Sequence, residues 1–178
     1  MTGYEEILNG IRQNDSRFQM QFYDMFATTT YQSAFAILGN SSDAEEIMQD
    51  CILKALTKIS LIKDDELQMR KILRRIAANA AIDVLRKRKC LFDFSENTLD
   101  CIDDENTDEN IMTVENIKKG IESLALGYRT ILSLHFFEDM SFNEISAKLK
   151  ISQPTVRSQY SRALMKLRDY LKNNMNND

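Results

Sequence analysis

The polar side of the last predicted helix, residues 153–172, carries side chains of the types that can hydrogen-bond to the edges of DNA bases. Arginine bonds to guanine, glutamine suits adenine, and serine and threonine make short adaptable contacts. On a wheel of about 100° per residue, these residues lie opposite or beside an apolar face: Thr155, Arg157, Ser158, Gln159, Arg162 and Lys166. The apolar face consists of Val156, Tyr160, Ala163, Leu164, Leu167, Tyr170 and Leu171. The pattern predicts noncovalent reading of a DNA sequence, with an ordinary solvated helix as the alternative.

Two predicted helix starts indicate that a shorter helix comes directly before the helix that carries this polar face. Ser141 and Glu144 have the spacing of a capping box, which begins a helix that ends near Leu149. Ser152 then suits the cap of the last helix, and Pro154 lies in its first turn, where a backbone N–H is not needed. A short capped helix, a turn of about three residues and a longer basic helix are typical of a helix-turn-helix, whose second helix enters the major groove.

A second basic helix is predicted over residues 67–89. Its apolar side consists of Met69, Leu73, Ile76, Ala77, Ala80 and Val84. Its other side presents Lys71, Arg75, Asn79, Arg86 and Lys89, with Arg70, Arg74 and Arg88 in a second basic row. By spacing alone, these basic rows suit DNA, a membrane surface or an acidic partner. The apolar side lacks the Trp and bulky Phe of a membrane-lying helix, which favours packing into a protein core.

Charge is distributed unevenly along the 178 residues, although the net charge is only −4. Residues 66–90 hold eight Lys or Arg against two acids, and residues 148–173 hold seven against one. Between them, residues 90–117 hold nine acids and neither Lys nor Arg. Two basic blocks separated by an acidic one are what phosphate contact at two places requires. Solvated charged faces are the alternative.

Helical periodicity extends through most of the chain, which has only 5 Gly and 1 Pro. Further helices are expected over 4–12, 18–38, 42–59, 114–124 and 128–137. Gly39 suits a helix stop, and Ser42 with Glu45 reads as a capping box for the helix that follows. We therefore predict an all-α fold of two small helical domains joined by an acidic linker. The predicted parts are a first domain at 1–90, the linker at 91–112, a helix-turn-helix domain at 113–173 and a polar tail at 174–178.

Several classes of function are disfavoured by the composition. No stretch approaches the roughly 20 apolar residues that span a membrane, and the acidic start differs from a secretory signal. We therefore expect a cytoplasmic protein without membrane insertion. Three widely spaced cysteines and His135 lack the spacing of metal ligands. A nucleophile–base pair and a phosphate-binding glycine loop are also missing from the sequence, so we expect neither catalytic residues nor a cofactor.

Three stretches, in order along the chain, resemble one protein family. Residues 43–50 (DAEEIMQD) resemble “DAEDlvQe”, and residues 72–89 (ILRRIAANAAIDVLRKRK) resemble “WLyrIArNlalDylRrrr”. Residues 136–163, from FFEDMSFNEIS through ISQPTVRS to RA, resemble “yfeglsyeEIAe…lgIsegTVkSrlhRAr”. A helix-turn-helix is common to many regulators, whereas the second stretch is much rarer. Together they resemble the extracytoplasmic-function sigma factors, the minimal group of the bacterial sigma-70 family.

The resemblance implies an RNA polymerase sigma factor that binds core polymerase and directs promoter recognition, DNA opening and transcription initiation. The residues it implies for polymerase binding, in the first domain, are Asp43, Glu46, Gln49 and Asp50. Those it implies for the −10 promoter element are Arg75, Asn79, Arg86 and Lys87, to which the basic face adds Lys71. The segment 63–66 is where a flipped base is expected to be read. The last helix would read the −35 element through Arg157, Ser158, Gln159 and Arg162.

Some positions depart from the family pattern. Ile72 stands where the family has Trp, Gln159 and Leu164 where it is often basic, and Ser161 where it has a bulky residue or His. With fewer cations, we expect weak binding to the −35 element and greater dependence on polymerase. Many members of the family are held inactive by an anti-sigma partner.

Two competing functions are open. One is a stand-alone helix-turn-helix repressor or activator, which usually dimerises. The other is a helical adaptor that binds only proteins.

Overall fold

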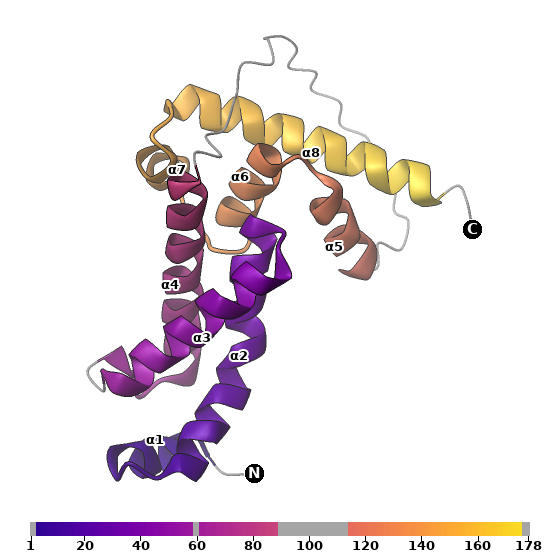
Figure 1. Ribbon diagram of the computed structural model, residues 1–178. Helices are drawn as coiled ribbons and strands as arrows, with labels where there is room; N and C mark the ends of the chain where they lie inside the picture. The colour runs from indigo at the N-terminus through magenta and orange to yellow at the C-terminus, as the bar shows by residue number, and fades with distance from the viewer. Residues whose placement is uncertain (1–2, 59–60, 89–113, 176–178) are drawn as a thin grey trace. The chain divides into compact units, whose positions relative to one another are not determined.

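The structure is a computed structural model that describes residues 3–58, 61–88 and 114–175. The regular elements within these ranges are all helices, which confirms the predicted all-α class. The chain divides into two compact units, Met1–Lys87 and Arg88–Asp178. The first contains α1 (Tyr4–Arg12), α2 (Ser16–Leu38), α3 (Ser41–Thr57) and α4 (Glu66–Lys87). The second contains α5 (Val114–Ser123), α6 (Leu126–Phe136), α7 (Phe142–Leu149) and α8 (Gln153–Met175) (Figure 1).

The predicted linker at 91–112 lies outside the described residues. Helix α8 continues to Met175, two residues into the predicted polar tail at 174–178. Two other helices begin earlier than expected for a local reason. Asp15 caps α2 by accepting a hydrogen bond from the Arg17 backbone N–H at 2.9 Å, and Asp65 accepts one from the Gln68 N–H at 2.8 Å. A capping carboxylate fixes the first turn of each helix ahead of its first apolar residue.

The core of the first unit forms where α2 packs against α1, α3 and α4. Phe22 and Phe26 of α2 are fully buried, with ring centroids 4.7 Å apart. Met69 and Leu73 of α4 are fully buried as well. Burial of each such side chain stabilises the fold by about 1.5–3 kcal/mol. This packing holds α4 by one side and leaves its other side available for binding.

The corner between α2 and α3 corrects one prediction. Gly39 ends α2 in the left-handed region (φ 65°), and its N–H donates to the Phe35 carbonyl at 2.7 Å, as its position in the sequence predicted. Asn40 then caps α3 by accepting from the Asp43 N–H at 2.9 Å. The predicted capping box of Ser42 and Glu45 is therefore wrong. The chain turns into α3 immediately after the glycine, so that Ser42 already lies inside the helix.

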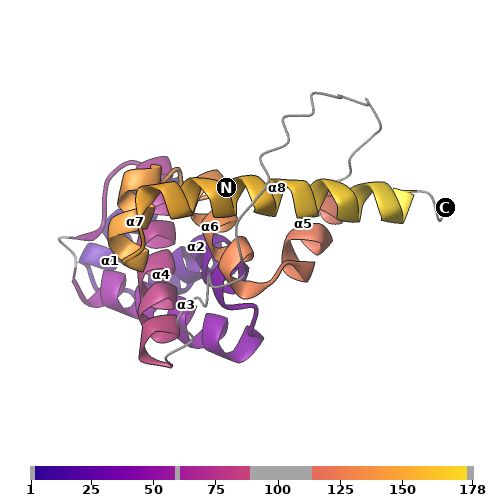
Figure 2. The same ribbon diagram turned by 90° about the horizontal axis from the view of Figure 1, so that it is seen from above.

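In the second unit, α5, α6 and α7 all pack against α8 (Figure 2). The buried centre of this packing is a cluster of Ile121, Leu124, Leu132 and Ala163. The predicted capping box at the start of α7 is confirmed. The Ser141 hydroxyl accepts from the Glu144 N–H at 3.3 Å, and the Glu144 carboxylate accepts from the Ser141 N–H at 2.9 Å.

The turn between α7 and α8 is tight and hydrogen-bonded. Lys150 adopts a left-handed conformation (φ 57°), which reverses the chain after α7. The Ser146 hydroxyl donates to the Ile151 carbonyl at 2.6 Å, and the Ile151 N–H donates to the Ser146 carbonyl at 3.2 Å. Ser152 accepts from the Thr155 N–H at 3.2 Å and so caps α8, as predicted. This turn fixes α8 against α7 in a helix-turn-helix.

Aromatic packing reinforces the same arrangement. The His135 ring of α6 stacks on Phe142 of α7 at 4.4 Å and meets the edge of Tyr160 of α8 at 4.7 Å. Its Nδ1 lies 2.8 Å from the Met140 carbonyl oxygen, which accepts the imidazole proton. Three helices of the second unit therefore share one aromatic contact.

Candidate nucleic-acid interface

The first turns of α8 present the polar residues that the sequence assigned to base reading. Arg157 and Ser158 are exposed, while Thr155 and Arg162 are half-buried. The hydroxyl of Thr155 lies 2.7 Å from that of the capping residue Ser152. The structure thus brings together four of the six predicted side chains near the start of a helix that is fixed at its N-terminus.

Lys166 lies further along α8 and differs from these residues in its surroundings. Its side chain is exposed, and its Nζ lies 5.5 Å from the ring centroid of Tyr128 on α6. At a rise of 1.5 Å per residue, nine residues separate Lys166 from Arg157 by about 13 Å along the helix axis. A cation at this distance suits a phosphate flanking the bases that Arg157 would reach.

The sequence-based wheel placed Gln159 incorrectly. The structure buries this side chain, of which only 6% is exposed. Three residues correspond to about 300° on a helix, so Gln159 lies within about 60° of the fully buried Val156 and faces the same core. In this conformation Gln159 is not presented to a base. Leu164, assigned to the apolar face, is instead 40% exposed at its edge.

The exposed side of α4 is the second predicted nucleic-acid surface. Lys71, Arg75 and Lys87 are exposed, and Asn79 is half-buried. Arg86 is exposed and lies 3.3 Å from an oxygen of Asp83, one turn earlier. This cationic stripe lies on the side of α4 that points away from the buried Met69 and Leu73.

The second basic row predicted on this helix has a structural role at two of its three positions. Arg70 is paired with Glu66 at 2.7 Å, and its guanidinium lies 5.3 Å from the centroid of the Phe26 ring. The Nε of Arg74 donates to the Ser33 hydroxyl at 3.3 Å. Both side chains reach across to α2. Long side chains commonly pack their stems against apolar surface in this way.

The residues that the family resemblance assigned to polymerase binding lie on α3. Glu46, Gln49 and Asp50 are exposed, whereas Asp43 is half-buried beside the cap of the helix. Sequence reasoning missed Leu53, which is 60% exposed one turn after Asp50. Positions 46, 49, 50 and 53 follow the i, i+3, i+4, i+7 spacing of one helical face, so this spacing could have revealed it.

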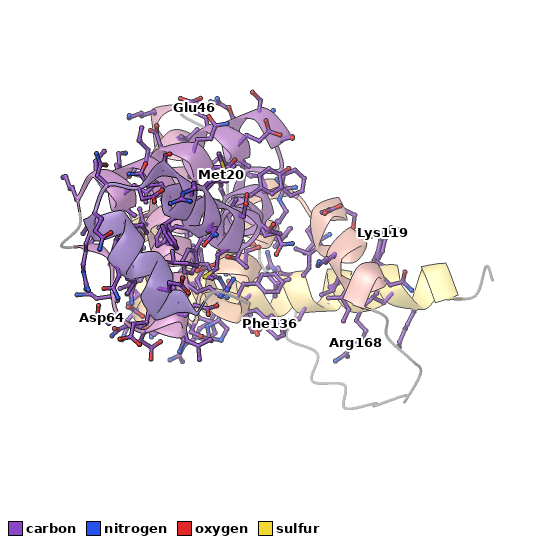
Figure 3. The ribbon with its side chains drawn as sticks, turned by 90° about the horizontal axis from the view of Figure 1, so that it is seen from below. Met20, Glu46, Asp64, Lys119, Phe136 and Arg168 are labelled. Carbon is purple, nitrogen blue, oxygen red and sulfur yellow. The ribbon has the colours of Figure 1, made fainter. Side chains whose placement is uncertain are left out.

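The segment that leads into α4 holds three consecutive acids, and each has a partner. Asp64 pairs with Arg12 of α1 at 2.8 Å, and Asp65 caps α4. Glu66 pairs with Arg70. In the view of Figure 3, the labelled Asp64 and Glu46 lie at opposite edges of the first unit. The first unit therefore offers separate surfaces at α3 and at the start of α4.

The described residues do not contain a group of three or more His, Cys, Asp or Glu arranged to hold a metal ion. Cys51 is buried in the core, and this burial raises the pKa of its thiol to about 11, so the thiol stays protonated at neutral pH. Among the helices described, none is long and apolar enough to cross a bilayer.

Taken together, the fold and these surfaces define an all-helical DNA-recognition protein with a helix-turn-helix in its second unit. Two parts of the chain match models of known protein families. Residues 22–90 match Sigma-70 region 2, and residues 115–167 match Sigma-70, region 4. The chain belongs to the sigma-70 family, as an extracytoplasmic-function (ECF) sigma factor. It acts in promoter recognition and transcription initiation.

Individual relatives agree with this assignment. The chain is 30% identical over 138 residues to the RNA polymerase sigma factor SigV of Bacillus subtilis, covering 78% of this chain and 81% of SigV. It is 26% identical over 175 residues to the ECF RNA polymerase sigma factor SigW of the same organism, covering 91% and 93%. The fold is similar to that of the sigma factor RpoE from Bartonella quintana, solved with the anti-sigma factor NepR. The TM-score is 0.50 at 20% identity, over 86% of this chain and 96% of RpoE.

Proposed function

We propose that this chain binds core RNA polymerase through α3 and directs it to promoters through α4 and α8. The observation that carries the proposal is the match of both units to the two sigma regions, each with an exposed polar helix face at the matching residues. In this proposal the first unit acts at the −10 element and helps to open the duplex, and the second reads the −35 element. The chain carries out no covalent chemistry of its own and works in the cytoplasm.

The surface proposed for polymerase combines charge with one apolar side chain. Glu46, Gln49 and Asp50 supply carboxylates and an amide, and Leu53 supplies apolar area that is 60% exposed in the free chain. An apolar residue inside a polar face is typical of an interface centre surrounded by a polar rim. We therefore include Leu53 in the proposed docking face as its apolar contact.

For the −10 element we propose the exposed stripe of Lys71, Arg75, Asn79, Arg86 and Lys87, and for the −35 element Thr155, Arg157, Ser158, Arg162 and Lys166. Gln159 is left out of the base-reading set because it is buried. Partners of the proposal are core polymerase, promoter DNA and an anti-sigma protein. The last is supported by the relative of the same fold that was solved bound to an anti-sigma factor.

The proposal is tested by mixing the full chain with core polymerase and measuring complex formation and DNA binding separately. We expect a stable complex that binds promoter DNA specifically, while the free chain binds DNA weakly. Leu53→Ala should weaken the complex about tenfold, because covering an exposed leucine side chain contributes about 1.5 kcal/mol. Met20→Ala is the matched control, since Met20 is 61% exposed on α2, outside the proposed face.

The competing functions predict different outcomes. Tight, sequence-specific binding of DNA by a free dimer would support a repressor or activator. Absence of any effect on DNA, with or without polymerase, would support a protein-binding adaptor. Equal affinity of Leu53→Ala and wild type for core polymerase would contradict the assignment of α3 as the docking face.

A further inference from the structure

Helix α1 precedes residues 22–90, which match Sigma-70 region 2, and the proposed function assigns it no role. In the structure it lies beside the chain that enters α4 (Figure 1). Two of its side chains contact that chain directly across more than fifty residues of sequence. They are Tyr4, at the first turn of α1, and Arg12, at its last.

Tyr4 holds the backbone of this segment. Its hydroxyl donates to the carbonyl oxygen of Lys63 at 2.8 Å. Its ring meets the fully buried Phe26 edge to face, with centroids 6.0 Å apart, so the hydroxyl is anchored to the core. Burial, followed by the nearby carboxylates of Glu66, Asp64 and Asp65, raises the pKa of Tyr4 to about 12. The phenol therefore remains a donor throughout the physiological range.

Arg12 acts on the charge of the segment. Its Nη2 lies 2.8 Å from an oxygen of Asp64, whose side chain is 84% exposed. The next acid, Asp65, is used as the cap of α4, and the third, Glu66, is paired with Arg70. Within residues 61–66, Lys63 is the one basic residue in the sequence. Without Arg12, Asp64 would be an uncompensated carboxylate within residues 63–66, where the family resemblance implies that a flipped base is read.

We propose that α1 is a specificity element, in which Tyr4 and Arg12 position residues 63–66 for base reading at the −10 element. The inference rests on the proposed function, because it requires this segment to face promoter DNA. Tyr4 sets the path of the backbone at Lys63, and Arg12 orients and neutralises Asp64. Both are positioning residues, since they act through the segment they hold.

The experiment uses holoenzyme assembled from core polymerase and the full chain carrying Tyr4→Phe, Arg12→Ala or Arg12→Lys. Each holoenzyme transcribes a promoter library in which the −10 element is randomised, and a second library in which the −35 element is randomised. Selectivity is the ratio of transcripts from the preferred base to those from the other bases. Tyr4→Phe and Arg12→Ala should each lower −10 selectivity about fivefold, as expected for one lost hydrogen bond or charge contact. Arg12→Lys should restore part of it.

Two matched controls test whether the effect depends on the contacted segment. Tyr31→Phe removes a hydroxyl that donates to Ser41 at 3.3 Å, and Arg17→Ala removes a cation paired with Asp15 at 2.8 Å. Neither pair includes residues 63–66, so both controls should keep wild-type selectivity. Affinity for core polymerase and −35 selectivity should stay unchanged in Tyr4→Phe, and the midpoint of thermal unfolding should fall only by the few degrees expected for one lost hydrogen bond.

Three results would overturn the inference. Full wild-type selectivity in both Tyr4→Phe and Arg12→Ala would refute the role of α1 and would leave the proposed function of the first unit intact. Equal losses at the −10 element, the −35 element and core binding would show a general structural effect and also refute it. A wild-type holoenzyme without any base preference at the −10 element would refute the proposed function of the first unit, and the inference with it.

Discussion

Arg157→Ala offers a direct test of base reading by α8. Arg157 is exposed in the second turn of the helix, and its truncation removes no buried contact. The variant should therefore keep the stability of the second unit. An arginine that contacts a guanine through both N7 and O6 contributes about 1–3 kcal/mol of discrimination. This corresponds to a loss of roughly 5- to 150-fold in preference at one base pair of the −35 element.

Lys166→Ala provides the contrast within the same helix. Because Lys166 lies about 13 Å further along the axis, we expect it to contact a phosphate. Its loss should weaken binding equally for all sequences and should lower the slope of log affinity against log salt by about 0.9. Arg157→Ala should instead relax the preference for one base at one position of the element.

The assay measures holoenzyme binding to promoter fragments that carry every single substitution in the −35 element, at three or more salt concentrations. Selectivity at one base pair should fall for Arg157→Ala and stay constant for Lys166→Ala. Identical selectivity profiles for both variants would refute the orientation of α8 that we infer. A loss of thermal stability in Arg157→Ala would refute the premise that the side chain is free of structural contacts.

Three further predictions concern stability and are measured by thermal or denaturant unfolding. Ser141→Ala removes the hydroxyl half of the capping box of α7, keeps the backbone N–H that donates to Glu144, and should cost about 1 kcal/mol, whereas Ser161→Ala at an exposed position of α8 should change little. Gly120→Ala should change the stability of the second unit by less than about 1 kcal/mol, because the methyl carbon of Leu167 that would lie 2.5 Å from the added Cβ ends a flexible side chain and alanine is favoured over glycine inside a helix; a loss of about 2 kcal/mol or more would refute this. The pKa of Cys51 is raised to about 11 in the folded chain, so the unfolded chain releases this proton first and stability should fall as the pH rises from about 9 towards 11. Cys51→Ala should show a smaller decline, and an equal decline would contradict the assignment.

The sequence predicted best what is decided locally. Gly39 ends α2, Ser141 and Glu144 form a capping box, and Ser152 caps α8, as their residue types indicated. Each of these features depends on a few neighbouring residues and on backbone hydrogen bonds, so spacing is sufficient evidence. The cap of α3 was missed because Asn40 and Ser42 both suit the role, and the position of the glycine turn decides between them.

The sequence predicted less well which polar side chains face solvent. Gln159 and Arg70 have residue types typical of a surface, yet one is buried and the other pairs with Glu66 beside the Phe26 ring. Their placement depends on the direction of the neighbouring helices, which periodicity along one helix does not contain. For the same reason, the contacts of α1 with residues 63 and 64 could not be predicted, since they join segments more than fifty residues apart.

The central claim is that the chain brings core polymerase to promoters through two separate DNA-reading helices. It is tested most directly by sequencing the 5′ ends of transcripts made from genomic DNA by core polymerase with and without the chain. We predict a new set of start sites that share two sequence elements, one dependent on α4 and the other on α8. Start sites that are unchanged by the chain, or that lack any shared upstream sequence, would contradict it.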